Sequence, residues 1–241
     1  MTDSDNQAGQ DDGAGLSRRR FLKATGNVAV GSVVGSALSG VFWLGDAVAA
    51  IPVSEGYLLV DRKKCQGCVS CMLSCSLVNE GVENLSLARI QIIQNSFEKW
   101  PDDVMIEQCR QCVEPKCLEA CPVDAIEANP EHGNVRQVNT EKCIGCAMCA
   151  DACPFTPSRP LLAADDAFEG ARTSRKCDLC ASAPYHWDDA GGGPDGMQAC
   201  VEVCPVGAIQ FTSEVPVQEG DAGYNVNLRG EAWGRLGFPT D

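Results

Sequence analysis

The sequence has few of the large side chains that usually fill a hydrophobic core. Of its 241 residues only 7 are Phe, 4 are Trp and 3 are Tyr, although hydrophobic residues make up 44% of the chain. Cysteine, by contrast, occurs 16 times. Because small cores with many cysteines are usually reinforced by disulfides or metal, we expect one of these to supply part of the stability. The composition excludes collagen-like, coiled-coil and multi-span membrane proteins.

Histidine and basic residues are also scarce. The chain has 2 His, which excludes a set of Cys2His2 zinc sites. Its 33 acidic residues outnumber 19 basic ones and give a net charge of −14, so nucleic acid is not an expected partner. There is no nucleophile–base pattern, phosphate-binding Gly-rich loop or flavin motif, and we expect His132 and His186 to be solvated. The sequence therefore predicts no catalytic residues and no small-molecule substrate.

The N-terminus has the pattern of a signal peptide. A basic segment at 17–23 precedes an uncharged stretch at 24–45 and an A-x-A cleavage site at 47–49. The paired arginines followed by Phe-Leu-Lys resemble the twin-arginine export signal. An uncleaved anchor is the alternative, since the uncharged stretch is long enough to span a bilayer. We predict that residues 1–49 are a twin-arginine signal and that the protein is exported folded, to the periplasm or the outer face of the cytoplasmic membrane.

The cysteines fall into four groups of four. In chain order these are Cys65, Cys68, Cys71 and Cys75; Cys109, Cys112, Cys117 and Cys121; Cys143, Cys146, Cys149 and Cys153; and Cys177, Cys180, Cys200 and Cys204. Two groups have the spacing C-x2-C-x2-C-x3-C, and proline follows the last three groups, as in bacterial ferredoxins that bind [4Fe–4S] clusters. Three thiolates two residues apart let a loop wrap one cluster, while Gly67 and Gly145 allow close backbone approach. The fourth cysteine is expected to serve a neighbouring cluster.

Disulfides and zinc are the alternatives to iron. Disulfides are common in exported proteins, but a disulfide framework has no reason to repeat this spacing. Zinc favours separated C-x2-C pairs, which only the fourth group resembles. We therefore predict iron–sulfur clusters, which a twin-arginine substrate acquires in the reducing cytoplasm before it crosses the membrane. A zinc-stapled interaction scaffold remains the structural alternative.

Internal repeats indicate an α+β fold. Residues 60–68 echo 138–146, and 121–126 echo 204–209, so the chain reads as a duplicated two-cluster unit. Duplication suggests that the first group pairs with the second and the third with the fourth, but spacing alone does not decide this. Short strands are expected at 57–61, 88–94, 104–108, 135–139 and 208–212. Short helices are expected after Cys71, Cys117, Cys149 and Cys200.

Residues 55–213 resemble a known family. The motifs that carry the resemblance are Cys109-x2-Cys112-x2-Pro115-x-Cys117, Ala152-Cys153-Pro154-Phe155, Lys176-Cys177-Asp178-x-Cys180 and Ala199-Cys200-Val201-Glu202-Val203-Cys204-Pro205. Together they resemble the four-cluster electron-transfer β subunits of dimethyl-sulfoxide-reductase-type molybdoenzymes. In that family the outer two groups pair with each other, and so do the inner two.

The resemblance implies a row of four [4Fe–4S] clusters. Their ligand sets would be Cys65, Cys68, Cys71 and Cys204; Cys177, Cys180, Cys200 and Cys75; Cys109, Cys112, Cys117 and Cys153; and Cys143, Cys146, Cys149 and Cys121. It implies two ferredoxin-like two-cluster modules with short strands, short helices and long loops within residues 50–213. The outer module would comprise 55–80 plus 170–213, and the inner module 100–160.

Two segments depart from that family. The 181–199 loop is expected to be either a docking loop or a flexible surface insertion. The tail, 214–241, carries Tyr224, Trp233 and Phe238, which would either grip a partner or fold back onto a module. Together with residues 87–91, the tail also resembles ferredoxin-like subunits that accompany tungsten-containing aldehyde oxidoreductases.

Iron with a full set of cysteine ligands passes electrons but binds no substrate. We therefore expect a non-catalytic electron-transfer subunit, and the resemblance implies a molybdenum or tungsten catalytic subunit and a membrane quinone or cytochrome subunit as partners. A free periplasmic ferredoxin-like carrier is the alternative. Five basic residues flank the cysteine loops and would raise cluster potentials, mark a docking surface or compensate charge. They are Lys63, Lys64, Lys142, Arg175 and Lys176.

Overall fold

The computed structural model describes residues 51–155 and 172–238. The expected signal peptide lies outside these ranges, as do residues 156–171 and 239–241. The described elements are β1 (Tyr57–Val60), α2 (Ser70–Glu80), η1 (Leu85–Leu87), β2 (Gln91–Gln94), β3 (Val104–Glu107), α3 (Lys116–Glu119), β4 (Ile126–Asn129), η2 (Pro130–His132), β5 (Val135–Val138), α4 (Met148–Asp151), α5 (Ala199–Glu202), β6 (Ile209–Thr212) and α6 (Glu231–Arg235). Within the two ranges, every helix is too short or too polar to span a membrane.

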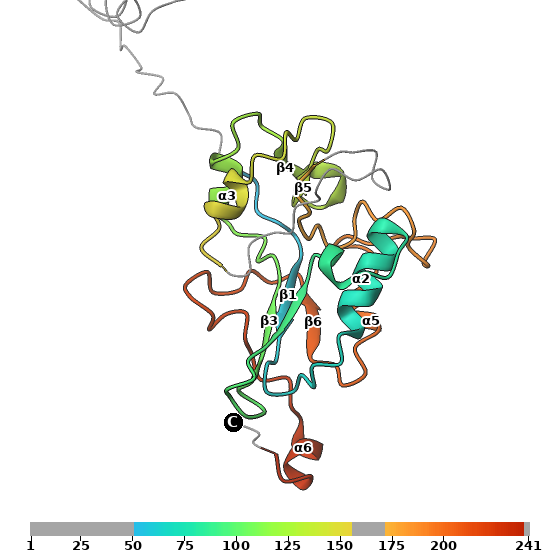
Figure 1. The fold of residues 1–241 in the computed structure, drawn as a ribbon, viewed down its shortest axis with the longest axis vertical. Coiled ribbons are helices and arrows are strands. Elements are labelled where there is room, and N and C mark those ends of the chain that lie inside the picture. The colour runs from blue at the N-terminus through green and yellow to red at the C-terminus, as the bar shows by residue number, and fades with distance from the viewer. Residues whose placement is uncertain (1–50, 156–171, 239–241) are drawn as a thin grey trace, which may run out of the picture. The chain divides into compact units, whose positions relative to one another are not determined.

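Three two-stranded antiparallel sheets organise the chain (Figure 1). The β1–β6 sheet joins the first and last cysteine groups, with Tyr57 opposite Thr212 and Val60 opposite Ile209. The β2–β3 and β4–β5 sheets join strands that are neighbours in sequence. Helix α2 packs against α5 beside the first sheet, and α3 packs against α4 near β4. The pairing of β1 with β6 is what brings the first and fourth cysteine groups to the same place.

The expected α+β class and its short elements are confirmed. All five predicted strands are present, each four residues long, and a helix lies at each of the four predicted places. Strand β4 and helix α6 were not predicted. The Glu and Asn of β4 have low strand propensity, so antiparallel pairing with β5 holds that strand in place. The side chains of Asn129 and Gln137 add a 2.7 Å hydrogen bond across this pair.

Cysteine contributes directly to the core. The main cluster of the core contains aliphatic residues from β1, β3 and the segment before β2. It also contains six cysteines, which come from the first, second and fourth groups. These six are Cys65, Cys71, Cys75, Cys109, Cys177 and Cys200. A second small cluster surrounds Cys180, and a third contains Cys117 and Cys149. Thiols therefore occupy the interior in place of the large side chains that the composition lacks.

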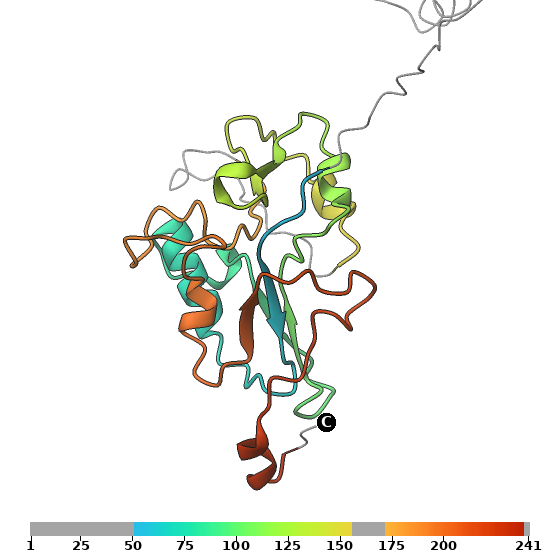
Figure 2. The ribbon, with the colours of Figure 1, turned by 180° about the vertical axis from the view of Figure 1, so that it is seen from behind.

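Part of the tail runs back along the body of the molecule, while α6 extends from its lower end (Figure 2). Asn225 forms a parallel bridge with Val60, and Tyr224 is 1% exposed with its hydroxyl donating to the Arg110 carbonyl at 2.7 Å. The Arg110 guanidinium stacks over Tyr224 and also pairs with Asp221. This pairing lowers the pKa of Asp221, chiefly through the Arg110 hydrogen bond. Tyr224 therefore covers the body rather than facing a partner.

The end of the tail packs beside the first cysteine loop. Phe238 makes edge contact with Trp100, at 5.0 Å between ring centroids, and Trp233 lies 5.4 Å from Phe238. The Trp100 indole donates a 3.2 Å hydrogen bond to the Cys65 carbonyl. Trp100 thus connects the tail aromatics to the loop that contains Cys65.

A buried ion pair ties the tail to the same loop. Arg229 Nε lies 3.0 Å from Asp61 Oδ2, and the two side chains are 5% and 2% exposed. Replacing Arg229 with Met leaves a buried carboxylate without this cation, so we expect a loss of about 3–5 kcal/mol in the free energy of unfolding. Equilibrium unfolding in guanidinium chloride under anaerobic conditions measures this loss. The control Arg235→Met changes an exposed residue of α6 and should stay within about 0.5 kcal/mol of the wild type. An equally small effect of Arg229→Met would contradict the anchoring role.

Candidate metal centres

Set one consists of Cys65, Cys68, Cys71 and Cys204, which line one cavity with Ile106 and other apolar residues. Three of its thiols come from the loop that enters α2, and Cys204 follows α5. Burial raises the pKa of Cys71 to about 12, and the neighbouring thiols of Cys65, Cys204 and Cys68 add to the effect. Cys68 is the exposed member of the set.

Set two consists of Cys75, Cys177, Cys180 and Cys200, and all four are buried. The Arg89 backbone N–H donates to Cys75 Sγ at 3.2 Å. Burial raises the pKa of Cys180 to about 12, with the Cys75 thiol acting in the same direction. Four buried groups that resist ionisation in this way need a cationic centre to hold them as thiolates.

Set three consists of Cys109, Cys112, Cys117 and Cys153. Burial raises the pKa of Cys112 to about 11, and the charges of the other three cysteines raise it further. Lys176 opposes this shift. The thiols of set three thus lie near enough to influence the pKa of Cys112.

Set four consists of Cys121, Cys143, Cys146 and Cys149, which line a cavity together with Ile126. Backbone N–H groups donate to two of the sulfurs, from Ala125 to Cys121 at 3.2 Å and from Ser174 to Cys143 at 3.4 Å. The exposed member is Cys146.

Sets one, two and four thus each line a common cavity. The grouping suggested by sequence duplication is not found, because cysteines of the first group share cavities with those of the fourth. Sheet β1–β6 causes this, since it pairs the two ends of the described chain rather than neighbouring repeats.

Short helices connect the sets in pairs. Cys71 and Cys75 lie one turn apart on the same face of α2, so this helix contributes one thiol to set one and one to set two. Cys200 and Cys204 do the same at α5. The corresponding pairs at α3 and α4 join set three to set four. They are Cys117 with Cys121 and Cys149 with Cys153.

The repeated Cys-Pro turns orient backbone donors toward sulfur. Asp124 and Gly207 occupy equivalent positions and both have positive φ, 49° and 59°. The N–H of the next residue then points back at the cysteine, and Ala208 donates to Cys204 Sγ at 3.1 Å as Ala125 does to Cys121. Hydrogen bonds of this kind stabilise the negative charge of a ligating sulfur.

The cavities suit a cluster better than a single ion. Among the described residues, no three His, Cys, Asp or Glu side chains approach closely enough to share one metal ion. Zinc bound at 2.3 Å would hold its sulfurs about 3.8 Å apart, which requires such an approach. A larger iron–sulfur group fits four separated thiols with apolar walls and N–H donors.

The 181–199 loop covers set two. Gly193 N–H donates to the Leu179 carbonyl at 2.7 Å, and a Cβ on Gly192 would come within 2.5 Å of the Cys180 backbone. His186 lies 3.0 Å from the Met197 carbonyl oxygen, within the loop itself. The loop is thus held against the body by backbone contacts, and its glycines permit the close approach.

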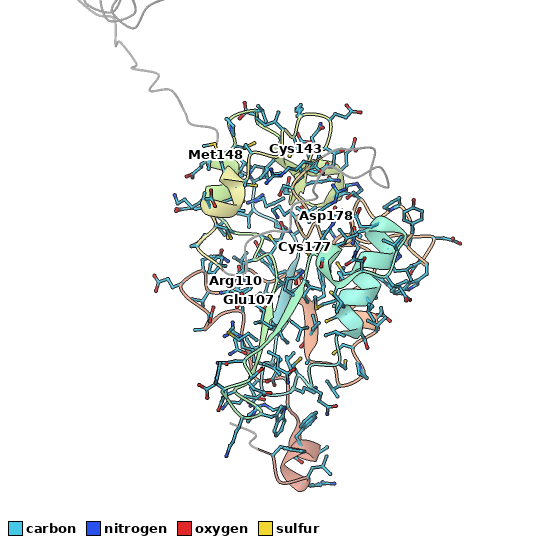
Figure 3. All side chains as sticks on the ribbon, in the orientation of Figure 1. Glu107, Arg110, Cys143, Met148, Cys177 and Asp178 are labelled. Atoms are coloured by element: carbon cyan, nitrogen blue, oxygen red, sulfur yellow. The ribbon has the colours of Figure 1, made fainter. Side chains whose placement is uncertain are left out.

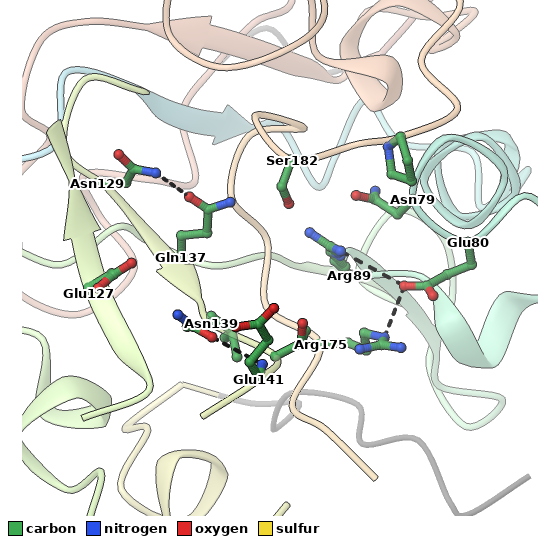
Figure 4. A pocket seen from close by; sticks show the side chains of 13 residues that line it. Asn79, Glu80, Arg89, Glu127, Asn129, Gln137, Asn139, Glu141, Arg175 and Ser182 are labelled. Carbon is green, nitrogen blue, oxygen red and sulfur yellow. Dashed lines mark hydrogen bonds and ion pairs between the residues drawn. The ribbon is translucent and has the colours of Figure 1, made fainter. Parts of the chain in front are cut away.

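A polar groove lies between α2, the 175–184 segment and the β4–β5 sheet (Figure 4). Glu80 occupies its wall, with Arg175 Nε at 3.0 Å and Arg89 at 3.8 Å. Arg89 also pairs with Asp178 at 2.9 Å. These residues join the segments that carry sets two and four. Sequence reasoning missed Arg89 because no local pattern marks a cation that becomes buried only in the folded chain.

Gly67 and Gly145 are equivalent in the repeat but differ in surroundings. A Cβ on Gly145 would lie 2.3 Å from the Arg172 carbonyl oxygen, whereas the nearest atom at Gly67 is 3.7 Å away. Both residues have positive φ, so alanine at either should cost about 1–2 kcal/mol. We expect Gly145→Ala to lower Tm more than Gly67→Ala, because the Arg172 backbone must also move. Equal decreases in Tm for the two variants would contradict a steric effect of the Arg172 backbone.

Comparison with known proteins points to the same chemistry. Residues 102–214 match the 4Fe-4S dicluster domain family. The chain is 31% identical over 158 residues to the ferredoxin-like protein YdhY of Escherichia coli (strain K12), covering 58% of this chain and 76% of YdhY. It is 34% identical over 171 residues to the electron transport protein YsaA of the same strain, covering 67% and 92%.

A third relative is the hydrogenase-2 operon protein HybA of Escherichia coli O157:H7. The identity is 29% over 218 residues, covering 81% of this chain and 62% of HybA. Together, these relatives and the dicluster domain show that the chain binds [4Fe–4S] clusters. The chain belongs to the ferredoxin-like iron–sulfur electron-transfer subunits of oxidoreductases.

Proposed function

We propose that the chain carries four [4Fe–4S] clusters, one in each cysteine set, arranged as two two-cluster modules. Sets one and two form the outer module, and sets three and four form the inner module. The observation that carries this proposal is the gathering of twelve thiols into three sets, each around a cavity with apolar walls. The remaining four cysteines form set three by the resemblance. Bound there, a [4Fe–4S] cluster accepts and donates one electron at a time.

The burial of the thiols supports a relay with two accessible ends. Cys68 of set one and Cys146 of set four are exposed, whereas every thiol of set two is buried. Helices α2 and α5 join sets one and two, while α3 and α4 join sets three and four. Gln111 and Lys176 both reach the Cys177 carbonyl and so link set three to set two. The sets therefore follow one another in the order one, two, three, four.

The environment of set four supports docking of a partner there. Ile144 and Met148 flank Cys146 and are 63% and 47% exposed. Apolar side chains beside a redox centre can exclude water and bring a partner's cofactor close. In Figure 3, Cys143 and Met148 lie at one end of the described body, well away from Glu107.

The partners follow from the resemblance and from the relatives' names. A relative named for a hydrogenase operon supports a separate catalytic subunit. We propose that this protein relays electrons between a membrane quinone or cytochrome subunit and a molybdenum or tungsten catalytic subunit. The twin-arginine pattern supports a site of action in the periplasm or on the outer face of the cytoplasmic membrane.

Metal analysis tests the cluster content. Four clusters require about 16 iron and about 16 acid-labile sulfide per chain in anaerobically purified protein, four of each per cluster. Reduced-state EPR should show spin coupling between adjacent centres. About 8 iron per chain would reduce the count to two clusters. Zinc in place of iron would overturn the proposal in favour of an interaction scaffold held together by zinc.

Purification from the native host tests the assignment as a subunit. We expect the protein to co-purify in fixed stoichiometry with a molybdenum- or tungsten-containing subunit. Ile144→Glu should weaken that complex at least tenfold, because it puts a charge into the surface beside Cys146. Val217→Glu is the matched control, since Val217 is equally exposed at 63% but lies in the tail. Recovery of a monomer with full iron would favour a free electron carrier instead.

A further inference from the structure

The fold separates Lys176 from the other four basic residues that flank the cysteine loops. Lys176 is 2% exposed. Lys63 and Lys142 are exposed, and Lys64 and Arg175 are partly exposed. The difference does not follow from local sequence, because Lys64, Lys142 and Lys176 each immediately precede a cysteine.

The Lys176 ammonium lies between two cysteine sets. Its Nζ is 2.8 Å from Cys109 Sγ of set three and 3.2 Å from the backbone carbonyl oxygen of Cys177 in set two. It therefore donates to a ligating sulfur on one side and only to a peptide oxygen on the other. A charge placed this way acts more strongly on set three than on set two.

In the part of the chain that the structure describes, this ammonium is not paired with a carboxylate. Within the described residues, no carboxylate oxygen lies within the 4.0 Å of Lys176 Nζ that defines an ion pair. Arg89, the cation beside set two, has both Asp178 and Glu80 as partners. The positive charge at Lys176 therefore remains available to the thiolates of set three.

A second buried cation reinforces the asymmetry. Arg136 is 0% exposed, and one guanidinium nitrogen donates to the Cys112 carbonyl of set three at 3.0 Å. Its other hydrogen bonds go to the carbonyls of Pro52 and Asn134. Within the described residues, the two cations near set three thus hydrogen-bond to sulfur and neutral oxygen, whereas the arginine of set two is paired with carboxylates.

We propose that Lys176 sets the reduction potential of the set-three cluster, holding it above that of the adjacent set-two cluster. The inference rests on the proposed function, in which both sets hold clusters. Reduction adds one negative charge, and a buried ammonium hydrogen-bonded to a ligating sulfur stabilises the reduced state. An electron that moves along the row of clusters would then reside on the set-three cluster between the two ends.

Redox titration followed by EPR tests the proposal on the full mature protein. Lys176→Met removes the charge and the donor, while Lys176→Gln keeps a donor without the charge. Both should lower the reduction equilibrium constant of one centre at least tenfold, which is 59 mV for one electron. The centre is identified as the one whose signal is altered in Cys112→Ala. Lys142→Met is the matched control, since Lys142 precedes a cysteine but is exposed, and it should change every centre less than twofold.

Iron content separates failure of this proposal from failure of the proposed function. If wild-type protein contains no iron in set three, the proposed function itself is overturned. Full iron in both neutral variants with potentials changed less than twofold would overturn only the role of Lys176. A shift in Lys176→Met but not in Lys176→Gln would assign the effect to the hydrogen bond and overturn the role of the charge. Loss of iron from both neutral variants, with retention in Lys176→Arg, would overturn it in favour of a structural role.

Discussion

The convergence of cysteine thiols, nine of the sixteen buried, on shared cavities is the constraint on which the rest of this structure depends. Burial raises the pKa of thiols such as Cys71 and Cys180 to about 12, so the protein alone cannot keep them ionised at neutral pH. A cationic iron core removes that penalty by binding the thiolates. Because cysteines also occupy the interior where large hydrophobic residues are lacking, metal binding and folding are coupled in this chain.

Local backbone conformation prepares the loops for this task. Val69 and Ala147 follow the second cysteine of their groups and adopt positive φ, as do Gly67 and Gly145. The left-handed turn lets the loop curl before the helix begins and presents three thiols to one side. Non-glycine residues in this conformation carry strain that surrounding structure must offset. Here the neighbouring sheet pairs and, in the proposed holo-protein, the bound cluster supply that compensation.

Charge is distributed very differently outside and inside the molecule. The chain as a whole carries −14, yet Lys176 and Arg136 are buried near set three. Burying a cation is unfavourable unless anionic groups surround it. Cys109 Sγ lies 2.8 Å from the Lys176 ammonium, so a thiolate at Cys109 would balance this buried cation. The basic residues that remain outside are balanced by an acidic, solvated surface.

The sequence by itself determined the cysteine loops, because spacing within a loop and the glycine, proline and repeat positions act over a few residues. It also predicted the five main strands and four short helices, which depend on similarly local patterns. The tertiary structure decided that cysteines of the first and fourth groups share cavities, since that depends on β1 pairing with β6 across most of the chain. It likewise decided that Lys176 is buried and Lys142 exposed, although both precede a cysteine. Burial and charge pairing arise from segments far apart in sequence, and no local pattern encodes them.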